Sequence, residues 1–438
     1  MVFVIRWGMN FCKSPFVQSL TVWAGAWTLA LTAAATPKPA WLTDLSLACK
    51  EGYDDNILLS GSGSTHDQSS WFTTVSPKVG VDLAPLLQVS QLPVAAFGYT
   101  PDFVAYHSTP TESYAAHRFT QSLKVRAGEF SGAVENSFVY VAGSETGPTY
   151  PEGRSCYSTS GVRERREQCQ ARGKVALQYD GKNWFARLAA SWLDYDLMTE
   201  IRDTASSPGY DNYADRSDLN GGFDCGYKIT SQLAATVGYR YGHQYQQQYF
   251  FNPDSSPSDY QRVLFGLEGK LCSWLTLTVQ AGPDFRDYAA NTATHTTPIT
   301  NPHLVTYYAE AQLTAQASTH DTFAFKYKQW QWVSSTGCAP YFDSTYDGSY
   351  NHKFDERLSL DLGARLLTAD YRSGNGAKAN RVDLQYALYE TLHYAINPHW
   401  SLELAYTAEF GRNDADIANP QTREYNRNLV SLGAQYKF

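Results

Sequence analysis

Charged residues recur at every second position in several segments of this sequence, and they are the side chains with the clearest chemical potential. The segment from Arg357 to Leu366 alternates leucine or alanine with arginine, aspartate, serine and glycine. A period of two places all of these charges on one face of a β-strand. If that face borders water, the charges could filter solutes by their electric field and by size.

The same alternation selects charged residues from many segments that would face one common aqueous space. They carry both signs, which predicts a lining with little fixed preference for either charge. The alternative is a ladder of salt bridges that stiffens the wall and filters nothing. The candidates are Arg187, Arg240, Arg262, Glu268, Asp284, Arg286, Glu310, Lys326, Lys328, Arg357, Asp361, Arg365, Arg381, Asp383, Glu403 and Glu409.

Two tryptophans extend one of these charged faces. Trp330 and Trp332 share a face with Lys326 and Lys328. Aromatic rings exposed to a channel could stack on sugar rings, which would favour saccharides as solutes. The alternative places both rings at the rim, in an interfacial girdle or under a loop.

Cysteine and histidine offer little further chemistry. Cys156 and Cys169 lie in one long polar segment and could form a disulfide in an oxidising compartment. The remaining cysteines lack the short spacing of a zinc site, so no metal and no cofactor is expected. The ten histidines are scattered, and no Ser-His or Asp-His cluster emerges. The sequence therefore predicts a protein that is not an enzyme.

The composition of the chain restricts the architecture that could position these residues. The charged fraction is 18%, against a usual value of about 25%, and aromatic residues make up 14%. A mean hydropathy of -0.40, with no apolar run of about 18 residues after the N-terminal region, excludes spanning helices. A net charge of -8 argues against a nucleic-acid partner, which would require a basic face.

The N-terminus has the features of an export signal. Arg6 and Lys13 precede an apolar stretch, and Ala33 and Ala35 fit the small-x-small cleavage pattern. We expect cleavage after Ala35; the alternative is an uncleaved anchor helix. The predicted division is a signal peptide at 1–35, a short periplasmic segment at 36–44 and a transmembrane barrel at 45–438.

The rest of the chain reads as strands of about nine to fifteen residues joined by connections that alternate in length. Short periplasmic turns and long outer loops are typical of transmembrane β-barrels. The count predicts an all-β, antiparallel up-and-down barrel of about eighteen strands, with sixteen as the alternative. Tyr436 and Phe438 end the clearest strand and resemble the C-terminal sequence recognised by the barrel insertion machinery.

Two stretches carry a resemblance to a known family. They are Gly52 to Ser60 followed by Val75 to Lys78, and Gly238 to His243 followed by Tyr260 to Arg262. These stretches resemble the outer-membrane β-barrel porin proteins of Gram-negative bacteria. The resemblance implies barrel architecture, location in the outer membrane and a transport role, and it specifies no substrate.

These observations lead to one expected function and one rival. We expect a porin-like channel for passive diffusion of small hydrophilic solutes, with saccharides as one candidate class. The rival is a non-conducting barrel that binds surface polysaccharide or scaffolds an export or adhesion assembly. The expected partners are outer-membrane lipids and lipopolysaccharide, the insertion machinery, the solutes themselves and further copies of the chain.

Overall fold

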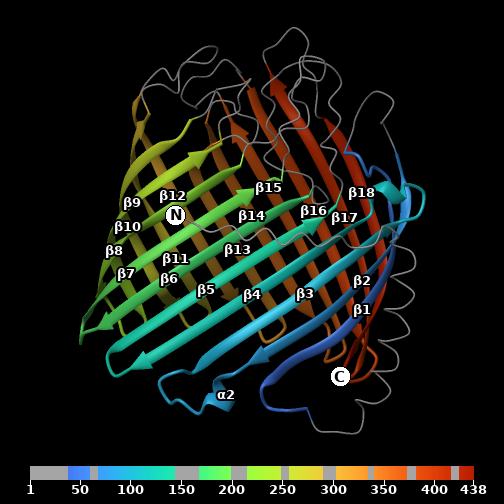
Figure 1. Cartoon of the computed structure of the whole chain (residues 1–438). Helices are drawn as coiled ribbons and strands as arrows, with labels where there is room; N and C mark the ends of the chain where they lie inside the picture. The colour runs from blue at the N-terminus through green and yellow to red at the C-terminus, as the bar shows by residue number, and fades with distance from the viewer. Residues whose placement is uncertain are drawn as a thin grey trace.

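The backbone forms a single closed sheet in which each strand is antiparallel to its two neighbours. The computed structural model describes residues 38–59, 68–143, 167–198, 215–247, 256–289, 302–333, 340–371, 381–415 and 424–438. Eighteen strands follow one another around the barrel in chain order, and β1 pairs with β18 to close it (Figure 1). The first and last strands therefore form a seam.

The strands contain between 12 and 16 residues, which is enough for a tilted strand to cross a bilayer. Their bounds are β1 (Leu42–Asp54), β2 (Ser70–Asp82), β3 (Val94–Tyr106), β4 (Tyr114–Ala127), β5 (Phe130–Ala142), β6 (Gln168–Asp180), β7 (Trp184–Asp196), β8 (Arg216–Lys228), β9 (Leu233–Gln246), β10 (Ser258–Cys272), β11 (Leu275–Tyr288), β12 (His303–Gln316), β13 (Asp321–Trp332), β14 (Tyr341–Lys353), β15 (Leu358–Asp370), β16 (Arg381–Ala395), β17 (Trp400–Ala415) and β18 (Tyr425–Lys437). In the described part of the chain, the connections contain two short helices, α2 (Ala84–Leu87) and η1 (Pro110–Glu112). Among the described residues, none belongs to a helix long and apolar enough to span a membrane.

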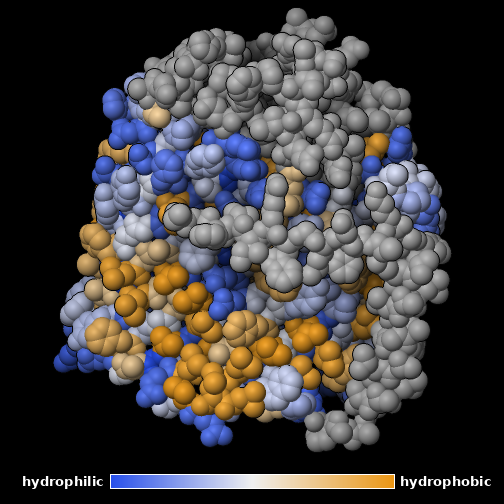
Figure 2. Space-filling model, viewed as in Figure 1, coloured by the Kyte–Doolittle hydropathy of each residue, from blue (hydrophilic) through white to orange (hydrophobic). Residues whose placement is uncertain are grey.

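The outer face of the barrel exposes apolar side chains. Leu388 of β16 is 54% exposed and Leu432 of β18 is 60% exposed. Figure 2 shows such residues concentrated over the lower half of the front face, with polar residues above them. Exposed leucines in this number are tolerated only against lipid. The chain is a transmembrane β-barrel.

An aromatic group marks the end of the barrel that carries the short turns. Trp400 packs edge-on against Tyr436 with ring centroids 5.0 Å apart, and Phe438 packs against the same tyrosine at 4.7 Å. Aromatic rings of this kind are typical of the membrane–water interface. A role for Tyr436 and Phe438 in recognition by the insertion machinery remains a prediction.

The inner face of the barrel can be recognised from side chains that contact each other although their strands are not neighbours in the sheet. Arg187 of β7 donates a hydrogen bond of 2.9 Å to Glu268 of β10, across β8 and β9. Side chains separated by two intervening strands can meet only on the concave side. The pairing register then assigns alternate residues of each strand to this inner face.

The predicted fold class and the count of eighteen strands are confirmed. Short turns such as 181–183 and 396–399 join consecutive strands at one end of the barrel. β1 begins at Leu42, inside the segment predicted to be periplasmic. The predicted signal peptide at 1–35 lies outside the described residues and remains a prediction.

A pair of adjacent substitutions tests the assignment of the two faces. Leu388→Arg places a cation in lipid near the middle of β16 and should lower the free energy of unfolding by about 2–4 kcal/mol. Ala387→Arg places the same cation on the inner face, beside Glu409 and Arg365, and should cost much less. Urea-induced unfolding in lipid vesicles measures both, and equal costs would contradict the assignment.

Candidate lumenal site

The inner wall is asymmetric, because large side chains occupy one side and small ones the other. The inner faces of β10 to β14 carry Tyr260, Tyr308, Trp330, Trp332 and Tyr341, all of which are buried. The inner faces of β4 to β6 carry small residues between their charges, namely Thr120, Ser122, Ser131, Ala133, Ser137 and Ala176. We call these the filled side and the open side.

On the filled side, the end of β13 crosses into the lumen. Pairing between β12 and β13 stops at Ala309 and Gln329. Beyond that point the backbone carbonyl of Gln331 accepts a 2.9 Å hydrogen bond from the side chain of Gln244 on β9. The carbonyl of Val333 likewise accepts a 2.8 Å bond from Arg216 on β8. Residues 330–333, the crossing segment, therefore reach strands that are not their neighbours and narrow the lumen.

The two tryptophans belong to this crossing segment. Trp330 and Trp332 are only 5% and 3% exposed, and their rings stack with centroids 4.4 Å apart. Lys328 Nζ lies 3.7 Å from the Trp330 ring centroid, and the guanidinium of Arg216 lies 5.2 Å from that of Trp332. Cations and a second ring thus contact the aromatic faces, and a sugar would have to displace these contacts in order to stack.

A buried ion network supports the same side of the barrel. The carboxylate of Asp284 accepts hydrogen bonds of 3.0 Å from both Arg262 and Arg286. The ring of Tyr260 lies between these arginines and the carboxylate of Asp218, to which its hydroxyl donates at 3.0 Å. The ring has room because it lies over Gly242, where an added Cβ would come within 2.3 Å of the ring. These charges are matched and shielded from water.

A second ion network continues the first toward the periplasmic end. Asp224 accepts hydrogen bonds from Arg187 at 2.9 Å and from Arg240 at 3.0 Å. Arg187 also binds Glu268 through both carboxylate oxygens. Each arginine of this network therefore has a carboxylate partner, which is the arrangement expected of a ladder that stiffens the wall.

The extracellular end of the seam holds a separate ionic group. Asp54 of β1, whose side chain is fully buried, accepts hydrogen bonds from Arg427 of β18, the shortest being 2.7 Å. Arg427 also approaches Glu409 at 3.4 Å. Tyr106 of β3 donates to Asp54 at 3.2 Å. This group ties together the strands on both sides of the seam.

On the open side, the exposed charges are almost all positive. Among the described inner-face residues of β4 to β6, Glu135 is the one exposed carboxylate, whereas five cations are exposed there. Elsewhere on the inner face Asp347 and Glu403 are mostly buried, and Asp361 of β15 keeps 45% of its side chain exposed. The exposed inner-face cations are Lys78, Arg118, Lys124, Arg126, Arg172, Lys174, Lys270, Lys326, Lys353, Arg365 and Lys437.

These exposed cations fall into two classes. Lys78 pairs with Asp44 at 2.6 Å, Arg365 pairs with Asp347 at 2.8 Å, and Arg118 forms an ion pair with Asp102. A second class forms no ion pair with any carboxylate in the described part of the chain. Its members on the walls of the lumen are Lys124, Arg126, Arg172, Lys174 and Lys326.

At the periplasmic end, the lumen widens into a cavity of about 1100 Å³. Its wall includes the ion pair of Lys50 and Glu403, together with His393 and Arg357. His393 approaches Asp361 at 3.1 Å and Glu403 at 3.5 Å. Charged side chains therefore line part of the cavity, which is large enough for a small hydrated solute.

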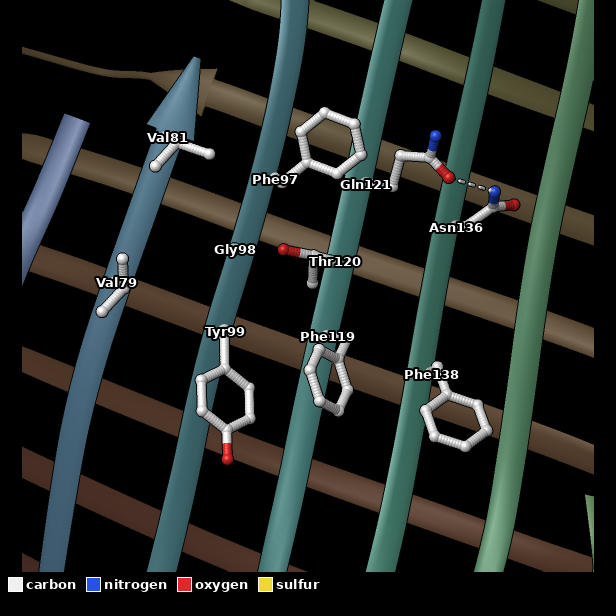
Figure 3. Close-up of a pocket in the computed structure, with 10 residues that line it drawn as sticks. All are labelled: Val79, Val81, Phe97, Gly98, Tyr99, Phe119, Thr120, Gln121, Asn136 and Phe138. Carbon is white, nitrogen blue, oxygen red and sulfur yellow. Dashed lines mark hydrogen bonds between the residues drawn. The ribbon is translucent and has the colours of Figure 1, made fainter. Parts of the chain in front are cut away.

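A second concavity, of about 380 Å³, lies on the outer wall and is not part of the lumen. Figure 3 shows its lining, in which Phe97, Phe119 and Phe138 project from β3, β4 and β5. Asn136 donates a 2.8 Å hydrogen bond to Gln121 within this lining. Because the three phenylalanines belong to the lipid-facing set, the concavity is a feature of the membrane surface.

Most of the predicted lining residues lie on the inner face, although their roles in selectivity remain predictions. Arg357 lies in the turn before β15, and the side chain of Arg381 is outside the described residues. Cys156 is also outside the described residues, so its predicted disulfide with Cys169 stays a prediction. The inner-face residues are Arg187, Arg240, Arg262, Glu268, Asp284, Arg286, Glu310, Lys326, Lys328, Asp361, Arg365, Asp383, Glu403 and Glu409.

The cations of the open side were not among the lining residues predicted from sequence. Arg118, Lys124 and Arg126 alternate with Phe119, Leu123 and Val125 in β4, so the period of two was present there as well. The same alternation in β4 and β6 would have predicted that these cations face the lumen.

Comparison with known proteins gives distant structural neighbours. No protein-family model matches the sequence, and no curated protein matches it. Solved structures with a similar course of the chain include Pseudomonas aeruginosa OccK2 (OpdF) in complex with glucuronate, at 10% identity and a TM-score of 0.42, covering 91% of this chain and 100% of that one. Pseudomonas aeruginosa OpdK with vanillate is 11% identical with a TM-score of 0.41, and the match covers 91% of this chain and 100% of that one. Acinetobacter baumannii OccAB4 is 12% identical with a TM-score of 0.40, and the match covers 92% of this chain and 100% of that one. Similarity this low carries no argument about solutes.

The buried network allows a test of the filled side. Asp284→Ala removes the carboxylate shared by Arg262 and Arg286 and leaves buried cations unmatched, which should lower the free energy of unfolding by about 3–5 kcal/mol. Glu135→Ala, at the exposed carboxylate, should change it by less than about 0.5 kcal/mol. Urea titration of both variants in vesicles is the measurement. A similar small effect for both would show that the network does not stabilise the barrel.

Proposed function

We propose that this protein is a passive diffusion channel for small hydrophilic solutes. The observation that carries the proposal is the open side, where small residues and water-exposed charges line the inner wall. A closed barrel whose lumen only stabilised the wall would be expected to match its charges, as the two ion networks do. Uncompensated exposed cations on the walls are instead suited to a water-filled path.

The number of strands supports the same proposal. An eighteen-stranded barrel belongs to the size class that leaves an aqueous channel. The crossing segment and the large side chains around it take up part of this width, so the path is expected to be narrower than the backbone alone suggests. A narrow aqueous path favours small solutes over polymers.

The rival function, a non-conducting barrel that binds polysaccharide or scaffolds an assembly, is favoured by one observation. The filled side is densely packed in its extracellular half. Saccharides as preferred solutes gain no support from Trp330 and Trp332, because both rings are buried. Lipids, lipopolysaccharide and further copies of this chain are proposed partners of the outer face.

A narrowing substitution on the open side tests the channel. Refolded protein in planar bilayers should show discrete, steady current steps. Ala133→Trp adds a large ring to the inner face between Lys124 and Ala176 and should lower the single-channel conductance, because the ring takes up part of the water-filled cross-section.

The matched control is the neighbouring residue. Val134→Trp places the same ring on the lipid-facing side, beside Leu123 and Val175, and should leave the conductance unchanged. Folding of each variant is checked by its heat-dependent mobility in gel electrophoresis. A folded wild-type barrel without current steps would favour the non-conducting rival.

A further inference from the structure

The open side points to a particular class of solute. We propose that the channel selects small organic anions, and that it does so through a basic track formed by Arg118, Arg172, Lys174, Lys124 and Arg126 on β4 and β6. This inference rests on the proposed diffusion function and adds a substrate class to it. The lining was expected from sequence to carry mixed charge with little preference.

The track is continuous because each successive inward row of β4 to β6 contributes one cation. The rows follow from the pairing register: Arg118 stands opposite Val139, Arg172 opposite Ser137 and Lys174 opposite Glu135. Lys124 opposite Ala133 and Arg126 opposite Ser131 continue the series toward the periplasm. Rows two residues apart are separated by about 6.6 Å along a strand. An anion leaving one cation is therefore already near the next.

Most of the track lacks counter-charge. Lys124, Arg126, Arg172 and Lys174 form no ion pair with the carboxylates that the structure describes, although Arg172 donates a 2.9 Å hydrogen bond to the hydroxyl of Tyr195. The one carboxylate within these rows is Glu135. By contrast, each of the four arginines in the two ion networks described above binds a carboxylate. The contrast separates cations that stabilise the wall from cations that face the solute.

The opposite wall narrows the path beside the track. Val333 of the crossing segment accepts a 2.8 Å hydrogen bond from Arg216 of β8, two strands from β6. Arg172 binds Tyr195, whose ring contacts the guanidinium of Arg216 at the crossing segment. Arg172 is therefore linked, through Tyr195 and Arg216, to the crossing segment that enters the lumen from β13.

The physical effect of the track can be given a magnitude. One unit charge about 8 Å from a solute ion in water changes the local concentration of that ion by about twofold, less where salt screens it. Several such charges in series favour anions over cations while holding none of them strongly, as conduction requires. The small residues between the cations leave room for an organic group. Carboxylate and phosphate anions share the chemistry that the track recognises.

Reversal potentials in a gradient of potassium chloride test the inference. The wild-type channel should pass chloride in preference to potassium. The double variant Arg172→Gln with Lys174→Gln should lower the chloride-to-potassium permeability ratio by at least about twofold. Glu135→Gln, which removes the carboxylate within the track, should raise it. Lys182→Gln, in the exposed turn after β6, removes a cation outside the lumen and should leave the ratio unchanged.

Solutes added at fixed voltage distinguish the kind of anion. Gluconate and glucose have similar size, so gluconate should interrupt the current at lower concentration if charge is selected. Inorganic phosphate added in their place shows whether any anion suffices or an organic group is needed as well. A channel that conducts without preferring chloride, or that keeps its preference in the double variant, would overturn the inference and leave the diffusion function standing. Absence of current in folded wild-type protein would overturn both.

Discussion

The need to satisfy every backbone hydrogen bond inside hydrocarbon determines this structure. No water is present there to bind an unpaired N–H or C=O group, so a sheet that spans the bilayer must close on itself. Here β1 meets β18 over the register from Ser46 with Lys437 to Asp54 with Leu429. Closure then creates one face against lipid and one face around a lumen. Every alternation of side chains along the strands follows from that division.

Charged side chains occur in two arrangements within the lumen, one buried and paired and the other exposed to solvent. On the filled side, Asp284 is shared by two arginines, and aromatic rings cover the ions. On the open side, the cations protrude between small residues and keep their contact with solvent. A buried charge without a partner would be costly, whereas an exposed one costs little. Burial therefore distinguishes a stabilising charge from one that is available to a solute.

The architecture could be predicted from sequence because lipid imposes a strict period of two. Leu358 to Leu366 on one face, with Asp361 and Arg365 on the other, gave both the strand and its orientation. The alternation of short and long connections gave the number of strands. These are local properties, and residues near one another in the chain determine them.

The character of the lining could not be predicted in the same way. The charge of Arg187 on β7 is balanced by Glu268 on β10, and two strands lie between them. The burial of Trp330 and Trp332 depends on the bend by which β13 leaves β12, and no residue pattern in β13 marks that bend. Both properties depend on residues that are far apart in the sequence and meet only in the folded barrel.

The seam has a consequence for how the barrel assembles. Seventeen of the eighteen strand pairs join segments that are neighbours in the chain, so each can form as a local hairpin. The last pair joins the two ends of the sequence, and its loop-closure entropy is the largest of all. An almost complete sheet with two unpaired edges should therefore precede the closed barrel during insertion. The buried contact between Asp54 and Arg427, on either side of the seam, can form only at that final step.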